Sequence, residues 1–378
     1  MKKEWQHKII VLGFILFLCF PTGRMIFTDK QEFLNRENRK SASFPKLDLH
    51  GQYNIIISAV KYFNDFIAYY SDNFGFRGEL LATYEFCKTA LFSINPFPEK
   101  VVLGTNGFYF LGNSFSDVIK ESKGISCFSE SQLGIIENNI LTIGEECRQR
   151  GITIYIAVAP NKHSVYGQYL PIIKSKHPTK LEQVVTRMSH HQINIIDLKR
   201  DFPIYKDKRL FYLHGTHWNS YGSFLGYRTF MDYIVRDFPE LKVFSINDFK
   251  LDTITSDTND LTGMLSLKIP EDKVIMEPKY VINARQEKPK LPVPDHYIRK
   301  RNSDDYEIRY INNGGPLKAL IFRDSFFDAM IPFFRDSFGE SVFIWSAFDR
   351  SLIEIEKPDL IIYEVIEREI EVFGKIDP

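Results

Sequence analysis

The chain has 378 residues, 44% of them hydrophobic and 25% charged, so it is long and apolar enough to bury a large core in two or three domains of roughly 150 residues. Lys and Arg together number 48, and Asp and Glu together also number 48. The formal net charge is therefore zero and gives no sign of nucleic-acid binding. The four cysteines form no C-x-x-C pair, which excludes a zinc ribbon or a thioredoxin-type site and leaves a Cys127–Cys147 disulfide open.

The N-terminal segment is predicted to be an export signal that stays attached. Three lysines and one glutamate precede an uncharged stretch of 15 residues, Ile9 to Gly23. That stretch is shorter than the roughly 18 residues of a secure membrane span and as long as a signal-peptide core can be. No A-x-A-like cleavage motif follows, and Leu18 is too bulky to precede a lipoprotein cleavage site at Cys19. We therefore predict an uncleaved anchor over residues 1–27, with the rest of the chain outside the cytoplasm, in a periplasmic or other extracytoplasmic space.

Three segments after the anchor carry clear secondary-structure patterns. Residues 28–98 are predicted to form a helical lead-in, because aromatic residues recur every three or four positions from Tyr62 to Tyr70. Asn106-Gly107 lies between two apolar runs and predicts a β-hairpin, since this dipeptide readily adopts positive φ. From Ser129 an amphipathic helix is expected to run to Gly151, a typical C-terminal stop, and to cover a sheet.

Short apolar runs predict the strands of that sheet: 152–159, 193–198, 317–322, 341–345 and 360–363. Because helical segments rather than two-residue turns separate most of these runs, the pattern favours βαβ units. The predicted fold class is α/β, with a parallel sheet flanked by helices. Residues 239–313 are polar and contain prolines, so we expect an insertion or lid of long loops there.

Ser325 stands in the sharpest local pattern for chemistry. An apolar strand ends at Phe322, a short polar turn follows, and a Phe-rich helical pattern continues to Phe334. A serine in such a turn lies at the carboxyl end of a parallel strand, where backbone N–H groups and a helix dipole can stabilise an oxyanion. Serine is also a preferred helix N-cap residue, and this segment alone favours neither interpretation.

His217 is the predicted general base for such a serine. It lies with His214 in a loop that is rich in Gly, Trp and Asn and precedes a helix. The two histidines at i and i+3 also suit a metal, but no neighbouring carboxylate or cysteine completes a ligand set, so no metal is predicted. For His214 a structural role, hydrogen-bonded to backbone, is the common alternative.

A third cluster follows the predicted strand that ends at Ala159. Lys162 and Tyr166 leave that strand on the same side of the sheet as Ser325, where α/β folds bind ligands. They are expected to face a substrate or to brace the nucleophile turn. The alternative is that Pro160 ends the strand and Lys162 is exposed to solvent.

Several short motifs follow one another over most of the chain: Glu37-Asn38-Arg39 with Phe44-Pro45, Asp72 to Arg77, Val102 to Phe110, Pro160-Asn161-Lys162 with Tyr166, Thr216-His217-Trp218-Asn219, Asp324-Ser325-Phe326, and Lys357-Pro358-Asp359 with Glu364 and Glu367-Arg368. In this order and spacing they resemble the alginate O-acetyltransferase family. Its members are anchored or periplasmic proteins whose SGNH-hydrolase-like domain transfers acetyl groups onto exopolysaccharide. The resemblance implies such a domain over residues 99–378, with the insertion at about 239–313.

The resemblance also implies the catalytic residues. Ser325 is the nucleophile and His217 the base, and Trp218 and Asn219 keep the family's residue types beside them. The family's third residue is an aspartate two positions before the histidine, where this chain has Gly215. A glycine cannot orient an imidazole, so either another acid reaches His217, or a weak dyad operates, or catalysis is lost. Asp324, beside the nucleophile, and Asp260, in the insertion, are the candidate acids.

Two functions therefore compete. In the first, Ser325 accepts an acetyl group and passes it to a sugar hydroxyl of a cell-surface or exported polysaccharide, without a cofactor; the resemblance implies a membrane acyltransferase as supplier of the acetyl group. A carbohydrate esterase is the variant in which water replaces the sugar. In the second, which Gly215 makes credible, the protein is a noncatalytic glycan-binding or scaffold member of the same assembly. Arg323, where esterases commonly have glycine, leaves the oxyanion hole undefined.

Overall fold

The computed structural model describes residues 2–27, 33–34, 39–46, 55–92, 94–193, 195–205, 207–265, 267–298 and 301–376. The chain divides into two compact units. The first comprises Met1–Pro96 with Met264–Ser266 and Arg299–Arg301, and the second comprises Phe97–Gly263, Leu267–Ile298 and Asn302–Pro378. The extents predicted for the anchor, the lead-in and the catalytic domain stay predictions.

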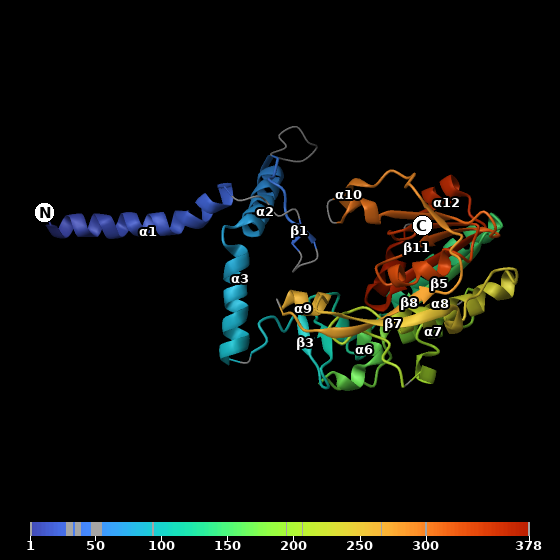
Figure 1. Ribbon diagram of the computed structural model, residues 1–378. Coiled ribbons are helices and arrows are strands. Elements are labelled where there is room, and N and C mark those ends of the chain that lie inside the picture. The colour runs from blue at the N-terminus through green and yellow to red at the C-terminus, as the bar shows by residue number, and fades with distance from the viewer. Residues whose placement is uncertain are drawn as a thin grey trace. The chain divides into compact units, whose positions relative to one another are not determined.

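Helix α1 (Lys2–Phe27) forms the start of the first unit (Figure 1). Its segment His7–Phe27, with a mean hydropathy of 2.2, is long and apolar enough to cross a membrane, as a signal sequence also would be. The uncharged stretch singled out in the sequence lies within this segment. An N-terminal apolar helix is therefore present.

The rest of the first unit is mostly helical. It contains α2 (Ile55–Asn73), α3 (Arg77–Phe86) and the π-helical turn Cys87–Leu91. The helical prediction is wrong for β1 (Phe33–Leu34) and β2 (Arg39–Lys40), which pair antiparallel. Residues 28–32, 35–38 and 47–54 lie outside the described residues, and with them Glu37 and Asn38 of the first motif.

The second unit is built on a seven-stranded sheet in the order β6-β5-β13-β11-β12-β10-β9. The strands are β5 (Thr153–Ala159), β6 (Ile195–Asp197), β9 (Arg285–Glu287), β10 (Glu307–Ile311), β11 (Lys318–Phe322), β12 (Glu340–Ile344) and β13 (Leu360–Ile366). From β6 to β12 neighbouring strands are parallel, whereas β10 and β9 pair antiparallel at one edge. The predicted α/β class with a mostly parallel sheet is confirmed, and each apolar run from the sequence forms one of its strands.

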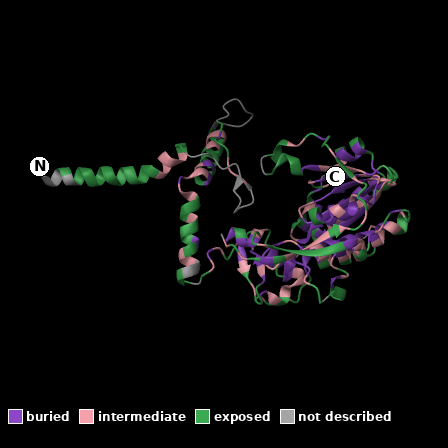
Figure 2. Ribbon diagram, in the orientation of Figure 1, coloured by how far each residue is buried: buried purple, intermediate pink, exposed green. Residues whose placement is uncertain are grey.

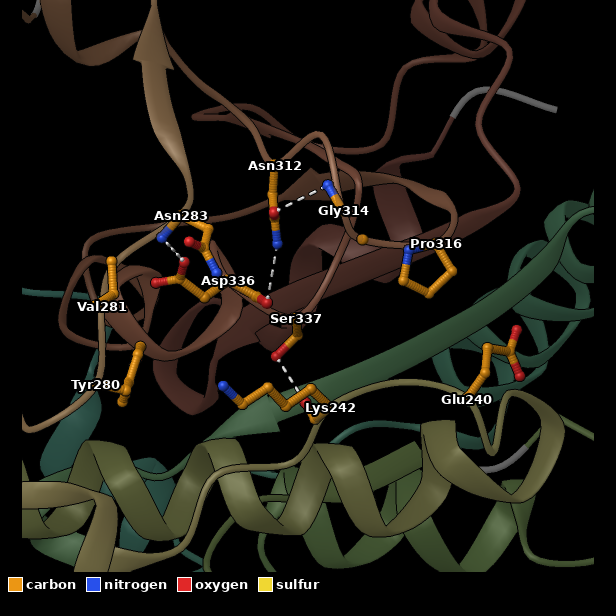
Figure 3. A pocket seen from close by; sticks show the side chains of 11 residues that line it. Glu240, Lys242, Tyr280, Val281, Asn283, Asn312, Gly314, Pro316, Asp336 and Ser337 are labelled. Carbon is orange, nitrogen blue, oxygen red and sulfur yellow. Dashed lines mark hydrogen bonds between the residues drawn. The ribbon is translucent and has the colours of Figure 1, made fainter.

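Helices cover both faces of the sheet, because successive side chains of each strand point to opposite sides. Ala319 and Ile321 of β11 pack into one core with α8 (Ser220–Asp237) and α11 (Ile331–Phe334). Their neighbours Leu320 and Phe322 pack into a second core. That core is shared with the helices α5 (Glu130–Gln149), α7 (Lys180–Met188), α12 (Arg350–Glu356) and the 3₁₀ segment Glu367–Lys375. Figure 2 shows this buried layer in purple.

Two local predictions are confirmed in the second unit. Strands β3 (Val101–Leu103) and β4 (Tyr109–Leu111) form the hairpin, with Asn106 and Gly107 at φ 54° and 77°. A capping box at Ser129 starts α5, and Gly151, at φ 72°, follows its end. Both turns use the left-handed backbone region that these residue types tolerate. The second unit also contains the short helices α4 (Val118–Ser122) and α6 (Lys162–Val165).

The segment 239–313 is more ordered than the sequence suggested. Besides β9 and β10 it contains α10 (Asp295–Ile298) and an antiparallel arm of β7 (Phe249–Ser256) and β8 (Glu271–Pro278). The connection between β7 and β8 carries the short helix α9 (Asp260–Met264). Most of the side chains of β7 are exposed, so the hydrophobic pattern was too weak to predict this arm.

The cysteines of the sequence are free thiols. Cys127 is half-buried and Cys147 is buried, and they are not joined to each other. The disulfide that the sequence left open is therefore absent.

Candidate active site

Ser325 lies in the turn after β11, at the carboxyl end of the central strand. The 3₁₀ turn Phe327–Ala329 and α11 follow it, and the N-cap position of that turn is Phe326, which makes no side-chain cap bond. The serine hydroxyl is instead 3.0 Å from Nε2 of His217. The geometry thus departs from the helix-cap interpretation and matches that of a nucleophile and its base.

His217 lies in a loop directly before α8. Phe211 and Trp218 form an isolated β-bridge that closes this loop, and the N–H of Tyr212 donates to the carbonyl of His217. The imidazole packs against the ring of Phe326, with centroids 4.7 Å apart. The residue next to the nucleophile therefore helps to hold the ring in place.

An acid from the insertion reaches the far side of the imidazole. Oδ2 of Asp260, the first residue of α9, is 3.6 Å from Nδ1 of His217. The hydroxyl of Thr216 lies between them: it donates to Oδ2 of Asp260 and is 3.1 Å from Nδ1 of His217. Since the hydroxyl has a single proton and gives it to the carboxylate, its oxygen is left to accept Nδ1–H. Nε2 then carries no proton and can accept the one from Ser325.

Asp260 is also fixed by the backbone, because its Oδ1 accepts from the N–H of Thr216 at 2.9 Å. Burial acts to raise the pKa of Asp260, but the charge of His217 and the hydrogen bonds from Thr216 outweigh it and lower the pKa to about 2. A Cβ added to Gly215 would lie 3.1 Å from Oδ1 of Asp260. The carboxylate thus lies beside the position where the resembled family has its aspartate.

Asp324, the other candidate acid, has both carboxylate oxygens bound by backbone N–H groups. Its carboxylate accepts from the N–H groups of Phe326 and Ile366, both at 2.7 Å. Its own N–H donates to the buried Glu364. Burial raises the pKa of both carboxyls, and in Glu364 the charge of Asp324 adds to the effect. Asp324 therefore shapes the nucleophile turn.

Arg323 is buried beneath the same turn and is not among the residues that line the pocket at Ser325. Its guanidinium pairs with Asp328, donates to the carbonyl of Asp305 at 3.0 Å, and stacks 4.9 Å from the ring of Trp345. This arginine holds the turn from below, which is a structural role.

Trp218 and Asn219 position the elements around the pair. The indole N–H of Trp218 donates to the carbonyl of Phe326 at 2.9 Å and so ties the histidine loop to the nucleophile turn. The Asn219 side chain caps α8 by accepting from the N–H of Tyr221 and of Gly222. These bonds explain both residue types without a contact to substrate.

Lys162 and Tyr166 brace the histidine loop rather than the nucleophile turn. The alternative of an exposed Lys162 is wrong, since the residue is 2% exposed and its Nζ donates to backbone carbonyls, among them that of Gly215. Burial lowers the pKa of Lys162 to about 7. The hydroxyl of Tyr166 accepts from the N–H of Leu210 at 2.8 Å.

A pocket of about 400 Å³ opens at Ser325 and His217. Its other walls come from the loop before α8, from the connection between β7 and β8, and from the segment after Ser325: Tyr212, Gly215, Trp218, Asn219, Ser220, Ser223, Thr258, Asn259, Asp260, Lys273, Asp328 and Ala329. Among the described residues no group of His, Cys, Asp or Glu is arranged to hold a metal ion. His214 instead lies with Nδ1 3.3 Å from Oε2 of Glu271, a carboxylate that no pattern in the sequence singled out.

Residues 112–290 match the family described as the SGNH hydrolase-like domain of the acetyltransferase AlgX. The chain contains an AlgX-like, SGNH-hydrolase-like domain. This AlgX-like match includes His217 and Asp260 and ends before Ser325. Over residues 112–290 the match therefore agrees with the resemblance found in the sequence. No curated protein sequence matches the chain.

Solved structures agree on the fold. Bacillus cereus PatB1 superposes with a TM-score of 0.53 at 14% identity, over 71% of this chain and 96% of that one. PatB1 with a sulfonyl adduct gives 0.51 at 16% identity, over 66% and 92%. The O-acetyltransferase domain of Pseudomonas putida AlgJ gives 0.43 at 16% identity, over 74% and 95%. The two PatB1 structures place the AlgX-like domain in a known architecture.

Proposed function

We propose that this protein is an O-acetyltransferase that acts outside the cytoplasm on a cell-surface or exported polysaccharide. The arrangement of Ser325, His217 and Asp260 is the observation that carries the proposal, with 3.0 Å between Oγ and Nε2 and 3.6 Å between Nδ1 and Oδ2. Such an arrangement activates a serine for acyl transfer. Because the matching family is one of acetyltransferases, we expect the transferred acyl group to be acetyl.

The reaction follows from these contacts in two halves. In the first, Ser325 Oγ attacks the carbonyl carbon of an acetyl donor while Nε2 of His217 takes the hydroxyl proton, and the donor leaves with that proton. In the second, a sugar hydroxyl gives its proton to Nε2 and attacks the acetyl-serine ester. The oxygen of Ser325 recovers the proton as the acetylated sugar leaves. Asp260, through Thr216, keeps Nδ1 protonated and stabilises the imidazolium in both halves.

Two further features support the proposal, one for the acceptor of the acetyl group and one for its supplier. The pocket at Ser325 is open and combines the aromatic side chains of Tyr212 and Trp218 with polar ones such as Asn259, which suits a sugar acceptor. Helix α1 would hold the domain at the membrane, where a membrane acyltransferase would deliver acetyl groups. A carbohydrate esterase would use the same first half, with water in place of the sugar.

The experiment that tests the proposal compares acceptors. Purified full-length protein in detergent is given p-nitrophenyl acetate with and without oligosaccharides, and acetylated sugar is measured by mass spectrometry against released acetate. We expect transfer to a sugar with the wild type and none with Ser325→Ala or His217→Ala. Release of acetate alone would favour the esterase, and the absence of both products would favour the noncatalytic scaffold.

A further inference from the structure

The backbone of the histidine loop is held by charged side chains from distant segments. The bridge between Phe211 and Trp218 closes the loop, but among the backbone groups of residues 213–215 only the carbonyl of Leu213 has a backbone partner in the described residues, the N–H of Tyr109. A buried backbone group without a partner costs about as much as a lost hydrogen bond. Two buried side chains, Lys162 and Glu271, supply the missing partners.

Lys162 binds the carbonyl side of the loop. From the turn after β5 its Nζ donates to the carbonyl oxygens of Leu213 at 2.7 Å and Gly215 at 3.1 Å, and to that of Tyr109 in β4 at 2.6 Å. An ammonium group has three N–H donors, so all of them are engaged. The N–H of Tyr109 also donates to the carbonyl of Leu213, which joins the loop to β4.

Glu271 binds the N–H side of the same loop. From the first residue of β8 its carboxylate accepts from the N–H of Leu213 at 2.6 Å and from that of His214 at 3.1 Å. The residue is 4% exposed, and Arg209 lies 3.3 Å from its Oε1. Lys162 and Glu271 thus bind neighbouring backbone groups of one loop from two separate segments.

We propose that Lys162 and Glu271 are positioning residues that fix the His217 imidazole between Ser325 and Asp260. The carbonyl that Lys162 binds on Gly215 lies two residues before His217, so a shift there moves the ring directly. Burying two charges is costly, and well-packed apolar residues often stabilise a fold as much as a buried ion pair. Two buried charged side chains that bind the backbone of this loop are therefore better explained by the fixed geometry that they give than by stability.

This inference rests on the proposed function, so its test needs a readout that does not depend on acetyl transfer. The ring nitrogens of His217 provide one. In full-length protein labelled with ¹⁵N-histidine and held in detergent micelles, NMR reports which ring nitrogen carries the proton, and His217→Gln identifies the signals. We expect protonated Nδ1 and unprotonated Nε2 in the wild type near neutral pH.

The variants are Lys162→Met and Glu271→Gln, each with a matched control. Lys180→Met removes an equally buried lysine whose partners are the carboxylates of Glu121 and Glu371. Glu307→Gln changes a carboxylate that likewise accepts two successive N–H groups, those of Lys290 and Leu291. These controls share the burial and the charge but not the histidine loop.

We expect Lys162→Met and Glu271→Gln to shift His217 toward a mixture of tautomers. They should lower kcat by about 10²-fold, the effect of roughly 1 Å of misplacement, and leave KM unchanged. The controls should lower Tm by similar amounts with the His217 signals and kcat unmoved. If Lys162→Met does not fold, Glu271→Gln decides alone, because it keeps the size of the side chain.

His217 signals that stay at their wild-type positions in folded Lys162→Met or Glu271→Gln protein would overturn the inference. So would a loss of kcat that the controls share. If the wild type transfers no acetyl group but the ring signals still shift only in Lys162→Met and Glu271→Gln, the proposed function fails while the positioning role stands.

Discussion

Oδ2 of Asp260 lies 3.6 Å from Nδ1 of His217, and the Thr216 hydroxyl connects the two. The acid that we propose for the triad therefore comes from the connection between β7 and β8, whereas the family that the sequence resembles has it two residues before the histidine. A triad acts through positions in space, so an acid from another segment can take the same role.

Replacing Asp260 by Asn should lower kcat by about 10²- to 10⁴-fold with little change in KM, because the amide neither fixes the tautomer nor stabilises the imidazolium. Hydrolysis of p-nitrophenyl acetate measures this. Asp257→Asn, an exposed carboxylate in the same connection, is the matched control and should behave as the wild type. Equal turnover of the two variants would remove Asp260 from the site.

Gly215→Asp should lower turnover in the wild-type background. Its Cβ would lie 3.1 Å from Oδ1 of Asp260 and 3.3 Å from Cβ of Tyr212, and its carboxylate would stand beside a like charge. In an Asp260→Ala background the same change should restore part of the lost activity, since the new carboxylate then has both room and a role. A rise in turnover in the wild-type background would mean that Asp260 does not serve as the acid.

The stability that Asp260 contributes should depend on pH. Its folded-state pKa of about 2 lies below the ordinary value of 3.8, so the folded state binds fewer protons than the unfolded state over this interval. The contribution is complete above pH 4 and is lost as the pH falls toward 2; at about 1.4 kcal/mol per pKa unit it amounts to about 2 kcal/mol. Urea unfolding of the wild type and of Asp260→Asn measures it. The difference between them should shrink as the pH falls below 4, and a difference that grows there would contradict the assignment.

The anchor prediction concerns α1. Full-length protein expressed in a bacterium should stay with the membrane fraction through carbonate washing, since His7–Phe27 is long and apolar enough to cross a membrane. N-terminal sequencing of the purified protein checks whether the helix is retained. A mature N-terminus beyond Gly23 would show that the segment is a cleaved signal.

The sequence predicted the parts of this site that depend on local pattern. Apolar runs gave the strands, and the strand-turn arrangement and Gly-rich loop pointed to Ser325 and His217. Asp260 remained one of two candidates, because its approach to His217 depends on how the arm of β7 and β8 folds back, and exposed strands carry little hydrophobic pattern. The burial of Lys162 could not be predicted from the sequence either. Lysines are rarely fully buried unless paired, and the partners of this one are carbonyls of a distant loop.

The most direct test of the central claim is to trap the acetyl group on the enzyme. Full-length protein is mixed with p-nitrophenyl acetate, quenched in acid within the first turnover, digested and examined by mass spectrometry, with Ser325→Ala treated in parallel. The account predicts one acetyl group on the peptide that contains Ser325, absent from the Ser325→Ala protein and removed when an acceptor sugar is added before quenching. Acetyl groups on other residues only, or equal labelling of both proteins, would contradict it.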